Sequence, residues 1–191
     1  MRSDRILHHV RIVTGSAVLW MLLGFHWAIA DQTAEQLPGL FEELQQAVDP
    51  VEVRQIETAI WNQWLIPPDE AAGLLMSQIT HAMAQRELDL ALLLCNQLLD
   101  ASPDFSEAWN KRATIHYLQG NFEASVADIR ETLALEPRHF GAISGLGLIF
   151  IREKNYEAAL KAFEQVLAIS PGSVSAQSSV ERAKALQGKE I

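Results

Sequence analysis

The chain has 191 residues, of which 49% are apolar and 20% are charged, with a formal net charge of -9. This apolar content is enough for a packed core and excludes a wholly disordered chain. The single cysteine excludes an internal disulfide framework and paired-cysteine zinc or haem sites. The acidic balance argues against nucleic acid as a main partner, because phosphate contacts require clustered cations.

Residues 1–30 have the three parts of a secretory signal peptide. Three arginines and one aspartate precede the stretch 12–30, which is mostly apolar and contains no Asp, Glu, Lys or Arg. The stretch ends in Ala28-Ile29-Ala30, the small-x-small pattern that signal peptidase recognises. Residues 1–30 carry a net charge of +2, which leaves -11 on residues 31–191. We therefore expect an exported protein that begins at Asp31 after cleavage and lies in a bacterial periplasm.

The alternative for this segment is an uncleaved membrane anchor. A spanning helix needs about 20 apolar residues, and the stretch 12–30 is close to that length. The arginines before it would stay in the cytoplasm under the positive-inside rule, so residues 31–191 lie outside the cytoplasm in either case. With an anchor, the membrane would be contacted only through residues 12–30, and the rest would be the soluble arm of an envelope assembly factor.

Residues 31–71 are predicted to form two amphipathic helices. The first ends near Asp49-Pro50 and the second ends before Pro67-Pro68, because proline interrupts a helix. Their apolar residues recur at helical spacing: Leu37, Leu40, Phe41, Leu44 and Val48, then Val53, Ile56, Ile60 and Trp64. We expect this pair, with Trp61 and Trp64, to cap the first of the repeats that follow. The alternative is an exposed aromatic platform for a partner.

From residue 72 onwards the sequence repeats with a period of 34 residues. Pro103, Pro137 and Pro171 share this spacing, and it also joins Phe122 to Tyr156. Repeats of this length indicate stacked supersecondary units rather than one compact domain.

The period and its landmarks resemble the tetratricopeptide repeat, a helix–turn–helix unit of 34 residues. Residues 106–139 and 140–173 match it well, 72–105 is a degenerate copy, and 174–191 is expected to be a capping helix and tail. The matching landmarks are Trp109, Ala113, Gly120, Phe122 and Pro137, then Gly147, Phe150, Tyr156, Ala159, Phe163 and Pro171. The resemblance implies an all-α, right-handed α-solenoid. Gly120 suits a turn with positive φ, and Gly147 suits a close approach between helices.

The resemblance also implies a function in protein binding, through the concave face lined by the first helix (helix A) of each repeat. Carried over by position, the groove residues are Glu107, Asn110, Thr114, Tyr117, Leu118, Ser144, Leu148, Ile151 and Arg152. The carboxylate clamp found in some members needs Asn and Lys or Arg at several of these positions, and only Asn110 and Arg152 fit. We therefore expect an apolar or amphipathic segment as the ligand.

No catalytic or metal-binding constellation stands out, so no enzyme activity, catalytic residue, metal or cofactor is predicted. Cys95 lies at a position that packs between helices and is expected to be a buried, inert thiol. His81, His116 and His139 lack the spacing of metal ligands. Arg112 is expected to pair with Asp128 or Glu131 on the following helix.

Three hypotheses follow for the function. The first is a periplasmic adaptor or scaffold that binds a protein segment in the groove. The second is the membrane-anchored assembly factor described above. The third is an enzyme or small-ligand protein with an unrecognised site in residues 31–71. The sequence predicts neither the identity of the partner nor the oligomeric state, and it leaves open whether the groove or the Trp61/Trp64 segment binds it.

Overall fold

The computed structural model describes residues 36–189, which form nine α-helices and, within that range, no strand. The helices are α1 (Leu37–Gln46), α2 (Pro50–Trp64), α3 (Glu70–Ala84), α4 (Leu88–Ala101), α5 (Ser106–Gln119), α6 (Phe122–Leu135), α7 (Phe140–Arg152), α8 (Tyr156–Ile169) and α9 (Val174–Gln187). The expected all-α repeat array is confirmed. The expected signal peptide, 1–30, lies outside the described residues. Among residues 36–189, no helix has the length and hydropathy needed to cross a membrane.

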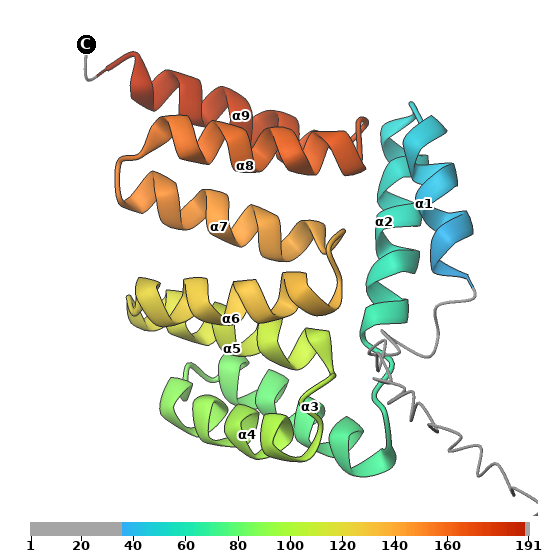
Figure 1. Cartoon of the computed structure of the whole chain (residues 1–191), viewed down its shortest axis with the longest axis vertical. Coiled ribbons are helices and arrows are strands. Elements are labelled where there is room, and N and C mark those ends of the chain that lie inside the picture. The colour runs from blue at the N-terminus through green and yellow to red at the C-terminus, as the bar shows by residue number, and fades with distance from the viewer. Residues whose placement is uncertain (1–35, 190–191) are drawn as a thin grey trace, which may run out of the picture.

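Helices α3 to α9 form the repeat array. In Figure 1 they lie one above another, with α3 and α4 at the bottom and α9 at the top, and each helix contacts the next one along the chain. Pairs of neighbours share apolar clusters, such as Cys95 and Leu98 of α4 with Ala108 and Ile115 of α5. The core is therefore a continuous seam between adjacent helix pairs, as stacked repeats require.

The backbone repeats the 34-residue period at each turn between the two helices of a pair. Arg86, Gly120 and Lys154, each 34 residues from the next, all have φ between 60° and 80°. In each case the N–H of the next residue donates to a carbonyl of the preceding helix. The three bonds run from Glu87 to Ala82 at 2.9 Å, from Asn121 to His116 at 2.8 Å and from Asn155 to Phe150 at 2.8 Å. This bond satisfies a carbonyl left free at the end of the helix. The positive φ expected at Gly120 is confirmed, and two non-glycine residues adopt the same conformation.

Close packing at Gly147 is also confirmed. A Cβ atom added at Gly147 would lie 2.6 Å from Cε1 of Phe163, so only glycine lets α7 approach α8 this closely.

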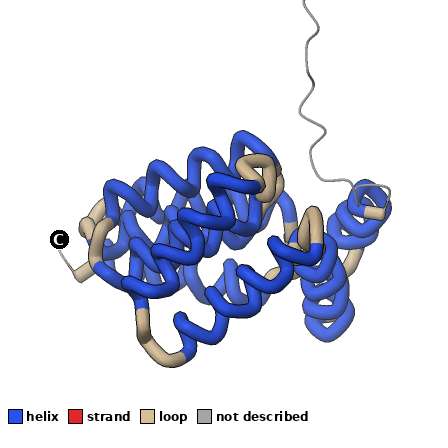
Figure 2. The backbone as a smooth tube through the Cα atoms, turned by 90° about the horizontal axis from the view of Figure 1, so that it is seen from below, coloured by secondary structure: helices blue, strands red, loops and turns tan. Residues whose placement is uncertain are grey.

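The helical hairpin α1–α2 does not cap the first repeat, and that expectation is wrong. In Figure 1 the hairpin stands upright beside the array, along the ends of α7, α8 and α9. The side-chain amide of Gln45 donates to the carbonyls of Ala168 at 2.7 Å and Ile169 at 2.8 Å. The hydroxyl of Ser170 donates to Glu57 at 2.8 Å. Figure 2 shows the hairpin to one side of the array when viewed along the stack.

Two glycines of the later repeats allow this docking. A Cβ at Gly172 would lie 2.6 Å from Cγ2 of Val53, and one at Gly141 would lie 2.6 Å from the Trp61 ring. The apolar stripe of α2, from Val53 to Trp64, therefore buries itself against the start of α7 and the end of α8. Val48, expected on the apolar face of the first helix, lies beyond the end of α1 and is 86% exposed.

Candidate functional site

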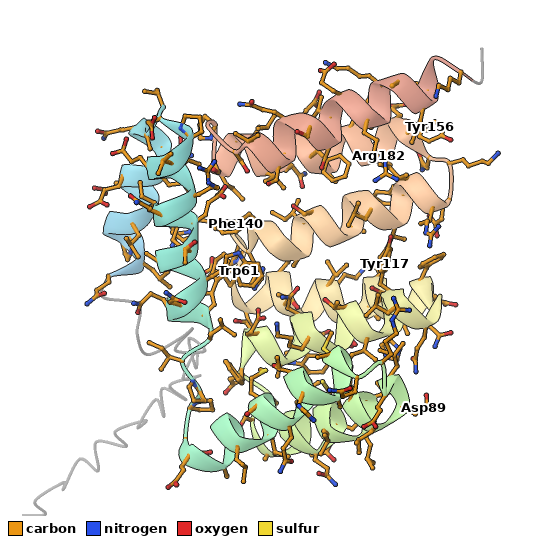
Figure 3. All side chains as sticks on the ribbon, turned by 180° about the vertical axis from the view of Figure 1, so that it is seen from behind. Trp61, Asp89, Tyr117, Phe140, Tyr156 and Arg182 are labelled. Atoms are coloured by element: carbon orange, nitrogen blue, oxygen red, sulfur yellow. The ribbon has the colours of Figure 1, made fainter. Side chains whose placement is uncertain are left out.

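The two neighbouring tryptophans lie at the junction between α2 and the array. Trp64 is fully buried, and its ring stacks on the His139 imidazole with centroids 4.1 Å apart and planes 13° apart. Trp61, half-buried, contacts Phe140 edge to face at 5.8 Å, and Figure 3 shows these two side chains together at the junction. The aromatic pair is thus part of the core, and the alternative of an exposed aromatic platform is wrong.

The same junction contains a buried carboxylate, Glu107 of α5. Its Oε2 accepts from the Asn110 side-chain amide at 2.9 Å and lies 3.1 Å from Nε2 of His139. Its Oε1 lies 3.2 Å from Nζ of Lys111. Because Nδ1 of His139 accepts the Ala142 N–H at 3.1 Å, Nε2 carries the imidazole proton and donates to Glu107. These partners offset the cost of burying the carboxylate.

Three of the predicted groove residues are buried, two of them in this cluster and one elsewhere. Glu107 and Asn110 are buried and bonded to each other, and Ile151 is buried in the cluster that includes Val180 and Ala183 of α9. Since none of the three is more than 9% exposed, these side chains offer little surface to a partner in this conformation. Since Asn110 is one of the two residues that fit a carboxylate clamp, its engagement by Glu107 adds to the sequence argument against such a clamp.

The other six groove residues keep exposed surface on two neighbouring A helices. They are Thr114, Tyr117 and Leu118 on α5, and Ser144, Leu148 and Arg152 on α7, helices that contact each other. Leu118 is 54% exposed, whereas Tyr117 is half-buried against Phe122 with ring centroids 5.7 Å apart. Leu148 is half-buried against the cluster beneath α9, and Arg152 is exposed. We call these six residues the α5–α7 surface.

Arg112 is a structural residue, as expected. Its guanidinium donates twice to Asp128, from Nε at 2.9 Å and from Nη2 at 2.7 Å, and once to Asn96 at 2.9 Å. The hydrogen bond with Asp128 raises the pKa of Arg112 above its already high value. The forked pair with Asp128 connects α5 to α6, and the bond to Asn96 connects α5 to α4. Of the two predicted partners, Asp128 is correct, and Glu131 is exposed.

Cys95 is a buried thiol, as expected. Burial raises its pKa to about 12, so the reactive thiolate is scarce near neutral pH. In the part of the chain that the structure describes, no group of three or more His, Cys, Asp or Glu side chains could hold a metal ion.

The hypothesis of an enzyme or small-ligand protein places a site in residues 31–71. Some of these residues line a hollow of about 360 Å³ between α1 and the end of α8. Its lining combines one carboxylate, Glu42, with the guanidinium of Arg138, which lies 3.8 Å from the Phe41 ring centroid.

The Glu107–His139–Trp64 contact was not predicted from the sequence. These residues lie on three elements and are separated by 32 and 75 positions. The resemblance placed Glu107 in the groove by its position in the repeat, and His139 was considered only as a metal ligand. His139 is the N-cap of α7, but histidine is not among the residues that usually signal an N-cap, so the sequence held no local hint of this contact.

Stacked antiparallel helix pairs with a 34-residue period, and an exposed surface on the first helices, define a class of α-helical repeat proteins. The chain belongs to the tetratricopeptide repeat family. The family's model matches residues 76–131 and 111–174. The chain is also 34% identical, over 146 residues, to a TPR repeat-containing protein of Rhizobium etli, with 76% of this chain and 72% of that protein covered.

Solved structures show the same fold. The Sgt2 TPR domain from Aspergillus fumigatus has a TM-score of 0.60 and 25% identity, and the match covers 65% of this chain and 83% of that one. The first TPR of Spaghetti (RPAP3) bound to the HSP90 peptide SRMEEVD has a TM-score of 0.58 and 21% identity, covering 61% and 95% respectively. Tetratricopeptide repeats are modules of protein–protein interaction, and related repeats are non-enzymatic.

Proposed function

We propose that this protein is an exported, non-enzymatic adaptor that binds a segment of an envelope protein on the α5–α7 surface. The observation that carries the proposal is Leu118. It is a large apolar side chain, 54% exposed, on a helix A next to Tyr117. Exposed apolar and aromatic side chains on one rigid surface are typical of protein interfaces.

The chemistry of the surface favours an apolar or amphipathic ligand. The HSP90 peptide in the RPAP3 complex, SRMEEVD, is acidic. In this chain the Asn110 amide already donates to the buried Glu107, and Arg152 is the one cation among the six residues of the α5–α7 surface. An acidic tail would find few donors here, whereas an amphipathic helix could place its apolar side chains against Tyr117, Leu118 and Leu148.

Export rests on the sequence of residues 1–30, with its basic start, apolar stretch and Ala28-Ile29-Ala30 end. Mass spectrometry of the protein purified from its native host tests this proposal. A mature chain that begins at Asp31 supports a cleaved, periplasmic adaptor. A chain that retains residues 12–30 and fractionates with membranes would replace it with the anchored assembly factor.

Two leucines of nearly equal exposure provide a matched test of the binding surface. Leu118 on α5 is 54% exposed and Leu93 on α4 is 55% exposed. We expect Leu118→Glu to reduce capture of the main partner by at least tenfold, in quantitative pull-downs of the tagged full chain from its host. Leu93→Glu should leave capture within about twofold. Both variants should keep their helical circular dichroism. Equal capture by wild type and Leu118→Glu would contradict the assignment of this surface.

A further inference from the structure

The two ends of the repeat array differ in polarity. At one end α9 exposes polar residues such as Ser175, Ser178, Glu181 and Arg182. At the other end, the outer face of α3 and α4 exposes three leucines, with Leu74 at 61%, Leu90 at 44% and Leu93 at 55%. Repeat arrays normally end in a helix with a polar outer face. Because the hairpin α1–α2 docks beside α7 to α9, no described helix covers this end.

The exposed face consists of one side of α3 and one side of α4, with a hollow between them. A hollow of about 440 Å³ lies between the two helices and is lined by Ser77, Gln78, His81, Ala82, Glu87, Leu90 and Leu94. On α3, Leu74, Gln78 and His81 share one side of the helix, because they are spaced by four and three residues. On α4, Leu90, Leu93 and Leu94 share one side in the same way.

The face also carries few charges for an acidic chain. Residues 71–85 and 90–99 contain no Asp, Glu, Lys or Arg, although residues 31–191 carry a net charge of -11. Glu87 is the one carboxylate in the lining of the hollow. Two copies of this chain, each with a net negative charge, repel each other less where such uncharged segments meet than where carboxylates meet.

We propose that the α3–α4 face is a homodimer interface, on which a second copy of this chain packs its own α3–α4 face around a two-fold axis. In such an interface the same patch serves both copies, so an apolar, uncharged face is its own complement. Glu87 is the one charged residue of the lining, so the hollow has little with which to select a charged segment of another protein. The dimer covers the leucines that no helix within residues 36–189 covers. This inference is independent of the α5–α7 surface.

The size of the face sets the strength of the dimer. Two helices about 22 Å long and about 10 Å wide present roughly 450 Å² per copy, or roughly 900 Å² in total. Stable complexes bury about 1,200–2,000 Å², and smaller interfaces belong to weak associations. We therefore expect a reversible dimer with a Kd on the order of micromolar, rather than an obligate one.

Cysteine crosslinking of the purified full chain tests the interface. Cys95 is buried, and burial raises its pKa, so a single introduced cysteine is the reactive one among the described residues. With a short bismaleimide, Leu93→Cys should form a species of twice the chain mass at least tenfold faster than Leu118→Cys, because equivalent residues near a two-fold axis face each other. Equal rates for the two variants would overturn the proposal.

Sedimentation equilibrium gives a second readout. The double variant Leu90→Glu/Leu93→Glu places four carboxylates in each dimer and should raise Kd by at least tenfold, while Leu118→Glu should leave it within twofold. Retained circular dichroism shows that the variants fold. A wild-type chain that stays monomeric at 100-fold its expected Kd would overturn the proposal.

If residues 1–35 covered the face instead, the mass would stay that of one chain and Leu93→Cys would resist labelling. Labelling without dimer formation would point to a different protein as occupant. Either result would refute the dimer.

Discussion

The repeat array and the α1–α2 hairpin are held by the same kinds of contact, but these contacts are arranged differently. Within the array, helices pack on their neighbours in sequence, and turns at Arg86, Gly120 and Lys154 repeat one hydrogen-bond pattern. The hairpin instead docks through contacts that occur once, such as Gln45 with Ala168, which are 123 residues apart. The comparison shows that a periodic sequence specifies its own stacking, whereas a non-repeated segment can attach wherever its apolar stripe finds a fitting surface.

Removing Trp64 should have the largest effect, because it lies at the centre of the hairpin junction between Phe41, His139 and Phe140. We expect Trp64→Ala to lower the free energy of unfolding by about 3–5 kcal/mol, the range for a buried aromatic. Urea denaturation measures this loss. Val48→Ala, in the same hairpin but exposed, should change it by less than about 0.5 kcal/mol. A loss below about 1 kcal/mol for Trp64→Ala would show that the junction does not anchor the hairpin.

Cys95 should make the stability of the array depend on pH at alkaline values. Burial raises the pKa of its thiol from 9.0 to about 12, so above pH 9 the unfolded chain loses this proton before the folded one does. The stabilisation is complete below pH 9 and should fall by about 1.4 kcal/mol per pH unit above it, or roughly 2–3 kcal/mol by pH 11. The measurement is the difference in unfolding free energy between wild type and Cys95→Ala at pH 8 and pH 11. The same difference at both pH values would refute the shift.

Arg112 connects three helices of the array and should come next in size. Arg112→Ala should cost about 2 kcal/mol, because it leaves Asp128 buried without its two charged hydrogen bonds, while the arginine itself is partly exposed. Arg112→Lys keeps the positive charge and should therefore recover part of this loss. The recovery should be incomplete, because an ammonium cannot form two parallel hydrogen bonds with Asp128. Chemical denaturation of the three proteins tests the order. If lysine were as destabilising as alanine, the charge at this position would contribute nothing.

The turns of the array should give the smallest effects, with a sign that depends on the residue. Arg86 and Lys154 hold positive φ with a side chain, so Arg86→Gly and Lys154→Gly should each raise stability by about 0.5–1 kcal/mol. Gly120→Ala, at the equivalent position, should lower it by about 1 kcal/mol. Thermal denaturation of the three variants checks these opposite signs, and a common sign would disprove the shared turn.

Much of the array was predictable because its information is local and repeated. Pro137 and Pro171 mark the ends of α6 and α8, and Gly120 marks a turn. The spacing between Arg112 and Asp128 follows from one helix packing on the next. The attachment of the hairpin was not predictable. Gly141 and Gly172 look like ordinary repeat residues, and only the structure shows that they admit Trp61 and Val53.

The candidate site was predictable in part for the same reason. Of the residues that position in the repeat assigns to the groove, Thr114, Leu118 and Arg152 are exposed. Glu107, Asn110 and Ile151 are buried, and Glu107 contacts His139, which lies 32 residues further along the chain. A side chain's exposure depends on its neighbours in space, and repeat position reports only those that the repeat itself supplies.

We propose that this chain binds another protein through the α5–α7 surface. Site-specific photo-crosslinking in the native host tests it most directly, with the photoreactive residue placed at position 118, or at Val51, an equally exposed control on α2. We predict a defined adduct with one other envelope protein from position 118 and none from position 51. No adduct at 118, or the same adducts from both positions, would contradict the account.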